Sequence, residues 1–198
     1  METKEKRYTK GDIESRADVD SGKNYISGRA IVYGSPYPMW EGCVEFIAKG
    51  ALDGADMSDV ICSFNHEDEL LLGRSVNGSG TLMLTPDENG LLFEVEANET
   101  TASKDCMINV QLKNVRGCSF EFTAAEESWE YDVPQADGTT ATVRTIVKIG
   151  KLYAVNPVVY PAYQETEVES IKRSAEKNKP QPKVNLNDQL LTITLETR

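Results

Sequence analysis

The sequence predicts a mainly β protein of the α+β class, in which a closed or nearly closed β-barrel carries helices packed outside it. Two observations carry this prediction. Short apolar runs alternate with polar residues along the chain and end at glycine, proline or asparagine, as strands do. Only one segment shows a convincing helical period, so helices are expected to be a minor part of the fold.

The strand candidates begin at Asn24, where the polar character of the first residues ends. The first one ends at the turn Gly34-Ser35-Pro36, and the loop of the hairpin at 78–97 ends in Gly90. A later hairpin turns at Asp137-Gly138. The expected strands and hairpins cover residues 25–33, 44–48, 59–64, 78–97, 118–122, 129–149 and 151–160.

The single helix is expected at 101–114, with Thr101 or Ser103 as its N-cap and Gly117 shortly after its end. Three regions follow from the composition. Residues 1–23 form a polar arm or edge strand, and 24–172 form one domain. Residues 173–198 form a linker and tail, because Lys, Asn, Pro and Gln dominate its first part and offer too little apolar surface to fold alone.

Composition excludes several classes of function. A formal net charge of −11 without a Lys/Arg stripe makes nucleic acid a poor partner. The apolar runs are too short to cross a bilayer, and the charged N-terminus lacks the pattern of a secretory signal, so we expect a cytoplasmic protein. Four cysteines without a CxxC pair and a single histidine argue against a zinc site. No phosphate loop is present, and no cofactor is expected.

Two residues could carry chemistry. His66 is the only histidine, so it is the only imidazole available as a general base, and it follows an apolar strand; it could equally begin an ordinary turn. Ser119 lies on a short apolar strand after Gly117, but a core serine bonded to a carbonyl explains that pattern as well. Nothing near Ser119 resembles a G-x-S-x-G elbow. The residues by themselves leave both alternatives open.

The order of several motifs resembles the HK97-type prohead protease family of tailed bacteriophages, which is related in fold to the herpesvirus assemblin proteases. F-N-H at 64–66 is similar to the family's N-H element, and R-G-C-S-F-E-F at 116–122 resembles its G-x-S-F-x-F strand. V-N-P-V-V-Y-P-A-Y resembles its V-S-x-V-x-x-P-A-Y ending. The matching segments cover residues 28–33, 45–52, 64–66, 72–74, 79–82, 90–94, 116–122 and 155–163.

The resemblance implies a serine endopeptidase of virion maturation with a barrel of the herpesvirus-protease type. It would work in the host cytoplasm inside the procapsid and cut the capsid scaffold, the scaffolding segment of the capsid protein, or itself. By position Ser119 would be the nucleophile and His66 the base. Backbone N–H groups at Gly117, with Arg116 or Arg74, are candidates for the oxyanion site. The herpesvirus relatives also suggest a homodimer.

One position departs from the family pattern. The strand before P-A-Y usually carries Glu or Asp as the third triad member, and this chain has Ala154 there. Three explanations compete: an engineered substitution, another carboxylate such as Glu67, Asp68 or Glu121 reaching His66, or a naturally weak enzyme. The alternative function is a non-catalytic protein that binds capsid or scaffold subunits on the same fold.

Overall fold

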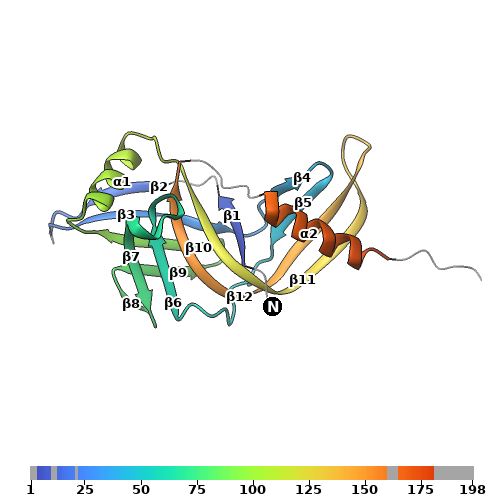
Figure 1. Ribbon diagram of the computed structural model, residues 1–198, viewed down its shortest axis with the longest axis horizontal. Helices are drawn as coiled ribbons and strands as arrows, with labels where there is room; N and C mark the ends of the chain where they lie inside the picture. The colour runs from blue at the N-terminus through green and yellow to red at the C-terminus, as the bar shows by residue number, and fades with distance from the viewer. Residues whose placement is uncertain (1–3, 10–12, 21, 160–164, 181–198) are drawn as a thin grey trace, which may run out of the picture.

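The computed structural model describes residues 4–9, 13–20, 22–159 and 165–180. Within them the chain forms an eight-stranded sheet, a four-stranded sheet and two α-helices (Figure 1). The larger sheet has the strand order β1-β11-β12-β6-β7-β8, with β5 also paired to β12 and β4 to β5. Its strands are β1 (Glu5–Thr9), β4 (Tyr37–Trp40), β5 (Cys43–Ile47), β6 (Asp59–Ser63), β7 (Leu71–Val76), β8 (Ser79–Gly80), β11 (Gly117–Pro134) and β12 (Thr140–Val158).

The smaller sheet has the order β2-β3-β10-β9 and is antiparallel throughout. Its strands are β2 (Ile13–Ala17), β3 (Asn24–Val32), β9 (Leu82–Asp87) and β10 (Gly90–Ala97). One hydrophobic core draws on both sheets, because Ile26 and Phe93 of the smaller sheet and Phe120 and Phe122 of β11 belong to the same buried cluster. The expected mainly β class is therefore correct.

The predicted closed barrel is wrong. In the part of the chain that the structure describes, the larger sheet ends at β1, β4 and β8 and the smaller one at β2 and β9, so both are open. The reason lies in β12, which pairs with β6 at Ala154 and with β5 along residues 142–146. The sheet therefore branches along β12 and does not continue around to meet its first strand. Alternation in the sequence shows which face of a strand is buried, but not which strand is its partner.

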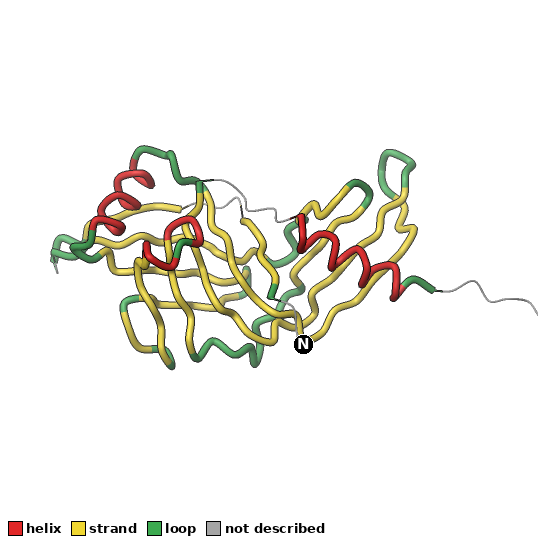
Figure 2. The backbone as a smooth tube through the Cα atoms, in the orientation of Figure 1, coloured by secondary structure: helices red, strands yellow, loops and turns green. Residues whose placement is uncertain are grey.

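Four segments that the sequence analysis treated as separate strands form only two long ones. β11 and β12 pair antiparallel over almost their whole length and end in a projecting hairpin (Figure 2). Several β-bulges interrupt their register, one of them between Glu121 and Phe122. A bulge bends a strand without ending it, so local breaks in alternation do not mark strand ends here.

The helices agree only in part with the prediction. α1 (Thr101–Gln111) occupies the expected region, but its N-cap is Thr100, whose hydroxyl accepts a bond from the Ser103 N–H. α2 (Glu165–Asn178) had no predicted counterpart and extends over the start of the expected linker. The Tyr131 hydroxyl donates to the Ala175 carbonyl and fixes α2 to the hairpin. No helix in the described ranges is both long and apolar enough to cross a membrane.

A buried ionic cluster fixes β1 along the outer side of β11. Arg7 and Arg144 lie among the carboxylates of Glu5, Glu45 and Glu127. All of these residues except Glu127 are almost fully buried. The Arg7 Nε atom lies 2.5 Å from Glu45 Oε1, and Arg144 bridges Glu5 and Glu45. Charges can be buried at acceptable cost only when they are paired in this way. The cluster therefore fixes the N-terminal strand beside the segment that contains Ser119.

Candidate active site

His66 lies at the end of a single helical turn, η1 (Phe64–His66), that directly follows β6. Asn65 and His66 both have positive φ, 54° and 65°, a region that residues other than glycine seldom occupy. The Asn65 side chain helps to hold this turn, because its Oδ1 accepts a bond from the Val159 N–H at 2.9 Å. Backbone strain of this kind is retained where the surrounding structure enforces it, often at functional sites.

Ser119 and Glu121 project from the same face of β11, because side chains alternate along a strand. Both are almost fully buried, with exposed fractions of 1% and 6%. Ser119 pairs across the sheet with Asn156, and Glu121 pairs with Ala154. Residues directly opposite in an antiparallel pair share a face, so these four side chains form a compact two-by-two patch.

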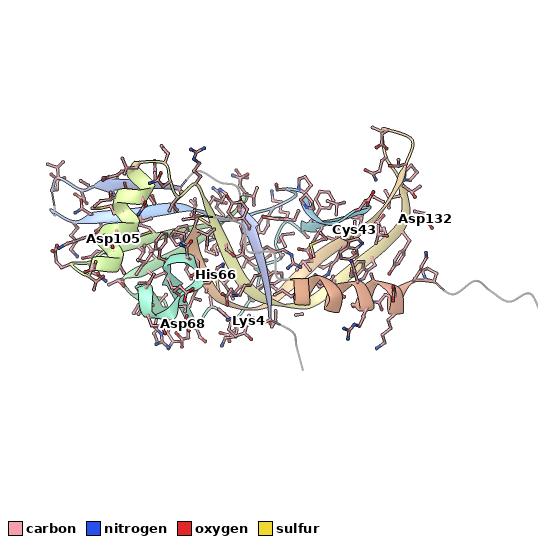
Figure 3. The ribbon with its side chains drawn as sticks, turned by 45° about the horizontal axis from the view of Figure 1, so that its top comes forward. Lys4, Cys43, His66, Asp68, Asp105 and Asp132 are labelled. Carbon is pink, nitrogen blue, oxygen red and sulfur yellow. The ribbon has the colours of Figure 1, made fainter. Side chains whose placement is uncertain are left out.

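The imidazole of His66 contacts this patch. Its Nδ1 atom lies 2.8 Å from Glu121 Oε1 and 3.0 Å from Asn156 Nδ2. Glu121 follows Ser119 on the same face, and Asn156 lies opposite it, so the ring rests on the two neighbours of the serine. Figure 3 shows His66 beside β11 in the middle of the molecule, with Asp68 on the outer side of the same loop.

The Glu121 carboxylate is charged at neutral pH. Burial by itself would raise its pKa, but the hydrogen bond from His66 and the ammonium groups of Lys4 and Lys6 outweigh that effect and hold the pKa at about 2. Lys4 contacts Glu121 Oε2, and Lys6 lies 3.2 Å from Oε1. The carboxylate is therefore shared between the histidine and two lysines at the N-terminal strand.

Two reactive atoms of the site have no hydrogen-bond partner among the residues that the structure describes. His66 Nε2 and Ser119 Oγ are both buried, and within the described residues neither forms a hydrogen bond, either to the other or to any other group. Buried polar groups are almost always satisfied in folded proteins, so each exception requires a reason. These two atoms are therefore available to bind a substrate or each other, although the hydroxyls of Ser15, Ser103 and Thr123 are also buried and unpaired within the described chain.

The structure decides which carboxylate reaches the histidine. Ala154 is buried beside Glu121, and its methyl group cannot bond to an imidazole. Glu67 and Asp68 are exposed, and neither forms an ion pair with His66 within the described chain. Of the three carboxylates weighed from the sequence, Glu121 is the one in contact. Glu121 lies on β11 directly opposite Ala154 of β12, the position where the sequence pattern expects an acid.

The candidate oxyanion residues are not all near the histidine. Gly117 starts β11, and a Cβ atom there would collide with the ring of Tyr8 in β1, so a larger residue would require that side chain to move. The Arg116 Nε donates to the Lys113 carbonyl. Arg74 is exposed and bonded to Asp59 through two nitrogens, so the structure does not bring it to His66. The oxyanion assignment stays a prediction.

Several contact residues were missed by the sequence analysis. Asn156 contacts the imidazole of His66 and is itself bonded to Ser63. Lys4 and Lys6 contact the carboxylate of Glu121. These are common residue types, and each lies far along the chain from the residue that it contacts. Only the strand register therefore reveals them. No group of three His, Cys, Asp or Glu side chains within the described ranges could hold a metal ion. The four cysteines are free and buried.

Comparisons with known proteins place the chain in a family. No curated protein sequence matches it. Among solved structures, the bacteriophage T4 capsid assembly protease gp21 matches with 12% identity and a TM-score of 0.45, over 79% of this chain and 97% of that one. A family model described as the caudovirus prohead serine protease matches residues 11–181. That match covers most of the sequence, so the chain belongs to the caudovirus prohead serine protease family.

Proposed function

We propose that this chain is a serine endopeptidase of capsid maturation in which Ser119 is the nucleophile, His66 the general base and Glu121 the third member. The contact between His66 Nδ1 and Glu121 Oε1 carries this proposal, together with an Nε2 atom that has no partner within the described part of the chain. A charged carboxylate at Nδ1 favours the tautomer in which Nδ1 carries the proton. The lone pair of Nε2 is then free to accept a proton from Ser119.

The reaction would follow from these roles. Nε2 takes the proton of the Ser119 hydroxyl as Oγ attacks the carbonyl carbon of the scissile peptide. Glu121 stabilises the imidazolium that forms, and Nε2–H then donates its proton to the leaving amine. Water then attacks the acyl carbonyl while Nε2 takes one of its protons. The acyl group leaves as a carboxylic acid, and Nε2–H returns a proton to Ser119 Oγ. Ground-state distances in such sites are often loose before substrate binds, so the missing Ser119–His66 bond is compatible with this role.

The Glu121 assignment accounts for Ala154 without an engineered substitution. Opposite residues of an antiparallel pair have Cβ atoms about 5 Å apart, so carboxylates at either position reach one imidazole. The third triad member would then have moved to the neighbouring strand. This explanation predicts an active enzyme, whereas loss of the acid without replacement predicts a weak one.

The substrate class comes from family membership. A prohead protease works in the procapsid of a tailed virus in the host cell, and its substrate is capsid or scaffold protein. We propose the scaffold, or the scaffolding segment of the capsid protein, as the substrate of this chain, with self-cleavage as a second event. We also propose that the chain forms a homodimer, which sedimentation of the purified protein tests.

A small fluorophosphonate probe tests the proposal. It should label Ser119, as seen by peptide mass spectrometry, and Ser119→Ala and His66→Ala should abolish the label. Co-expression with a candidate scaffold protein of the same virus should give scaffold fragments that disappear with the same two variants. Fragments that persist in Ser119→Ala would overturn the assignment.

Burial of the reactive atoms favours a second candidate, a non-catalytic assembly protein on the same fold. Ser119 is 1% exposed, so a substrate reaches it only if part of the surrounding structure moves. A folded wild-type chain that binds scaffold protein, but neither labels nor cuts during assembly, would support this reading. Labelling that requires both Ser119 and His66 would exclude it.

A further inference from the structure

Asn156 contacts the same imidazole nitrogen as Glu121, and its orientation is fixed from the other side. Its Oδ1 accepts bonds from the Ser63 N–H at 2.9 Å and the Ser63 hydroxyl at 3.0 Å. A backbone N–H can only donate, so the atom facing Ser63 must be the amide oxygen. The amide nitrogen of Asn156 therefore faces His66 Nδ1, at 3.0 Å.

His66 Nδ1 thus lies between a group that can only donate and a group that accepts. Asn156 Nδ2 carries two protons and has no accepting capacity, whereas the ionised Glu121 carboxylate only accepts. A neutral imidazole nitrogen carries either a proton or a lone pair, so it can satisfy one neighbour at a time. Each choice corresponds to a different tautomer of the ring.

We propose that Asn156 is a positioning residue that opposes Glu121 at His66 Nδ1, so that the two side chains together set the tautomer of the histidine. With Nδ1 protonated, the ring donates to Glu121 and Nε2 is free to act as a base. With Nδ1 unprotonated, the ring accepts from Asn156, and Nε2–H cannot take a proton from Ser119. The part of this inference that concerns catalysis rests on the proposed function.

Charge decides the balance between the two states. A hydrogen bond to an ionised acceptor is about twice as strong as one between neutral groups, so the Glu121 contact should prevail over the Asn156 contact. Lys4 and Lys6 oppose this, because they engage the same carboxylate from β1 and from the residue just before it. Groups that neutralise Glu121 therefore shift the ring towards the Asn156-bonded tautomer.

The single histidine of the chain makes this inference directly measurable. Protein labelled with ¹⁵N in the imidazole ring gives one pair of nitrogen resonances, and their shifts report which nitrogen is protonated. Asn156→Asp keeps the acceptor for Ser63 and replaces the donor facing His66 with a second acceptor. Because the Glu121 contact already prevails, its spectrum should stay at or move further towards the Nδ1–H tautomer, whereas that of Glu121→Gln should move towards the Nε2–H tautomer.

Asn89→Asp is the matched control, because it adds the same charge on an exposed hairpin between β9 and β10. It should leave both resonances in place. The inference is overturned if Asn156→Asp moves them towards the Nε2–H tautomer, or if Glu121→Gln does not increase the Nε2–H form. Both spectra are recorded on protein whose thermal unfolding shows a folded chain, so unfolding cannot imitate the result.

A rescue experiment separates positioning from structural support. In Glu121→Gln, adding Asn156→Asp supplies a carboxylate at the same Nδ1 and should restore probe labelling of Ser119 about tenfold or more. A purely structural Asn156 predicts no rescue. If the tautomers move as expected but no variant labels Ser119, the proposed function fails and the positioning role stands. If Ser119 labels while the tautomers stay fixed, the positioning role fails alone.

Discussion

Replacing Glu121 with glutamine removes one negative charge from the candidate site and keeps the size of the side chain. The carboxylate is 2.8 Å from His66 Nδ1 and nearly buried, so its charge acts on the imidazolium that forms when Ser119 is deprotonated. A neutral amide can also turn its donor towards the ring and favour the wrong tautomer. We therefore expect Glu121→Gln to fold but to react slowly at Ser119.

The size of the effect follows from the geometry. Two unit charges 2.8 Å apart attract by about 6 kcal/mol at an effective dielectric constant of 20. At 1.36 kcal/mol for each tenfold change, that is a ceiling of about 10⁴-fold in rate. Lys4 and Lys6 already neutralise part of the carboxylate, so the loss should fall between about 10²-fold and 10⁴-fold.

The assay is the second-order rate of fluorophosphonate labelling at Ser119, with scaffold cleavage as a second readout. Glu126→Gln is the matched control, because it removes a carboxylate from the same strand at an exposed position paired only with Lys148 among the described residues. It should label at the wild-type rate. A rate for Glu121→Gln within threefold of wild type, while His66→Ala is inactive, would refute the role of Glu121.

Three further predictions concern stability, and urea unfolding measures each of them. Asn65→Ala should lower the free energy of unfolding by about 2 kcal/mol, because alanine is strained at positive φ and the bond to the Val159 N–H is lost. Asn65→Gly loses only that bond and should lower it by about 1 kcal/mol. Equal losses for the two variants would contradict backbone strain at this position. Because the pKa of Glu121 is about 2 in the folded chain and 4.5 without its neighbours, its ionisation should stabilise the fold by about 3 kcal/mol above pH 4.5. That stabilisation should disappear as the pH falls to about 2, so a gap between wild type and Glu121→Gln that stays constant over this range would contradict it. Glu45→Gln should lower the free energy of unfolding by about 3 kcal/mol, because it leaves Arg7 and Arg144 buried with too few carboxylates. The exposed control Glu126→Gln should lower it by less than about 0.5 kcal/mol. A similar loss for the two variants would show that the buried cluster does not stabilise the fold.

Much of the fold was readable from local patterns. The strand at 25–33, the hairpin at 78–97 and the helix near 101 appear close to their expected positions, because alternation, turn residues and helical period are local signals. Strand pairing is not local. The branching of the sheet at β12 and the long bulged strands depend on contacts between residues far apart in the chain. Local patterns do not reveal such contacts, and the prediction of a closed barrel was therefore wrong.

The site was readable to a smaller extent. His66 was found because it is the only histidine, and Ser119 because the motifs around it resemble a family pattern. Glu121 was one of three carboxylates that the sequence could not rank, since only the register of β11 and the turn at His66 bring it to Nδ1. Asn156 had no signal of its own, because its partners lie on two other elements.

α2 was missed for a different reason. Its sequence is rich in charged residues, and the composition of the segment after Ile171 favours a linker. In the structure Ile171 and Ala175 are buried, and Tyr131 of the hairpin binds the carbonyl of Ala175. Tertiary contacts with the hairpin therefore stabilise a helix that its own sequence indicates only weakly. The tail at 181–198 lies outside the described residues.

The most direct test of the central claim is a crystal structure of the chain phosphonylated by the probe. The account predicts the adduct on Ser119 Oγ, with His66 Nε2 within about 3 Å of a phosphonyl oxygen and Nδ1 still bonded to Glu121. An adduct on another residue would contradict the account. So would a structure in which His66 Nε2 points away from Ser119, or in which a different carboxylate holds Nδ1.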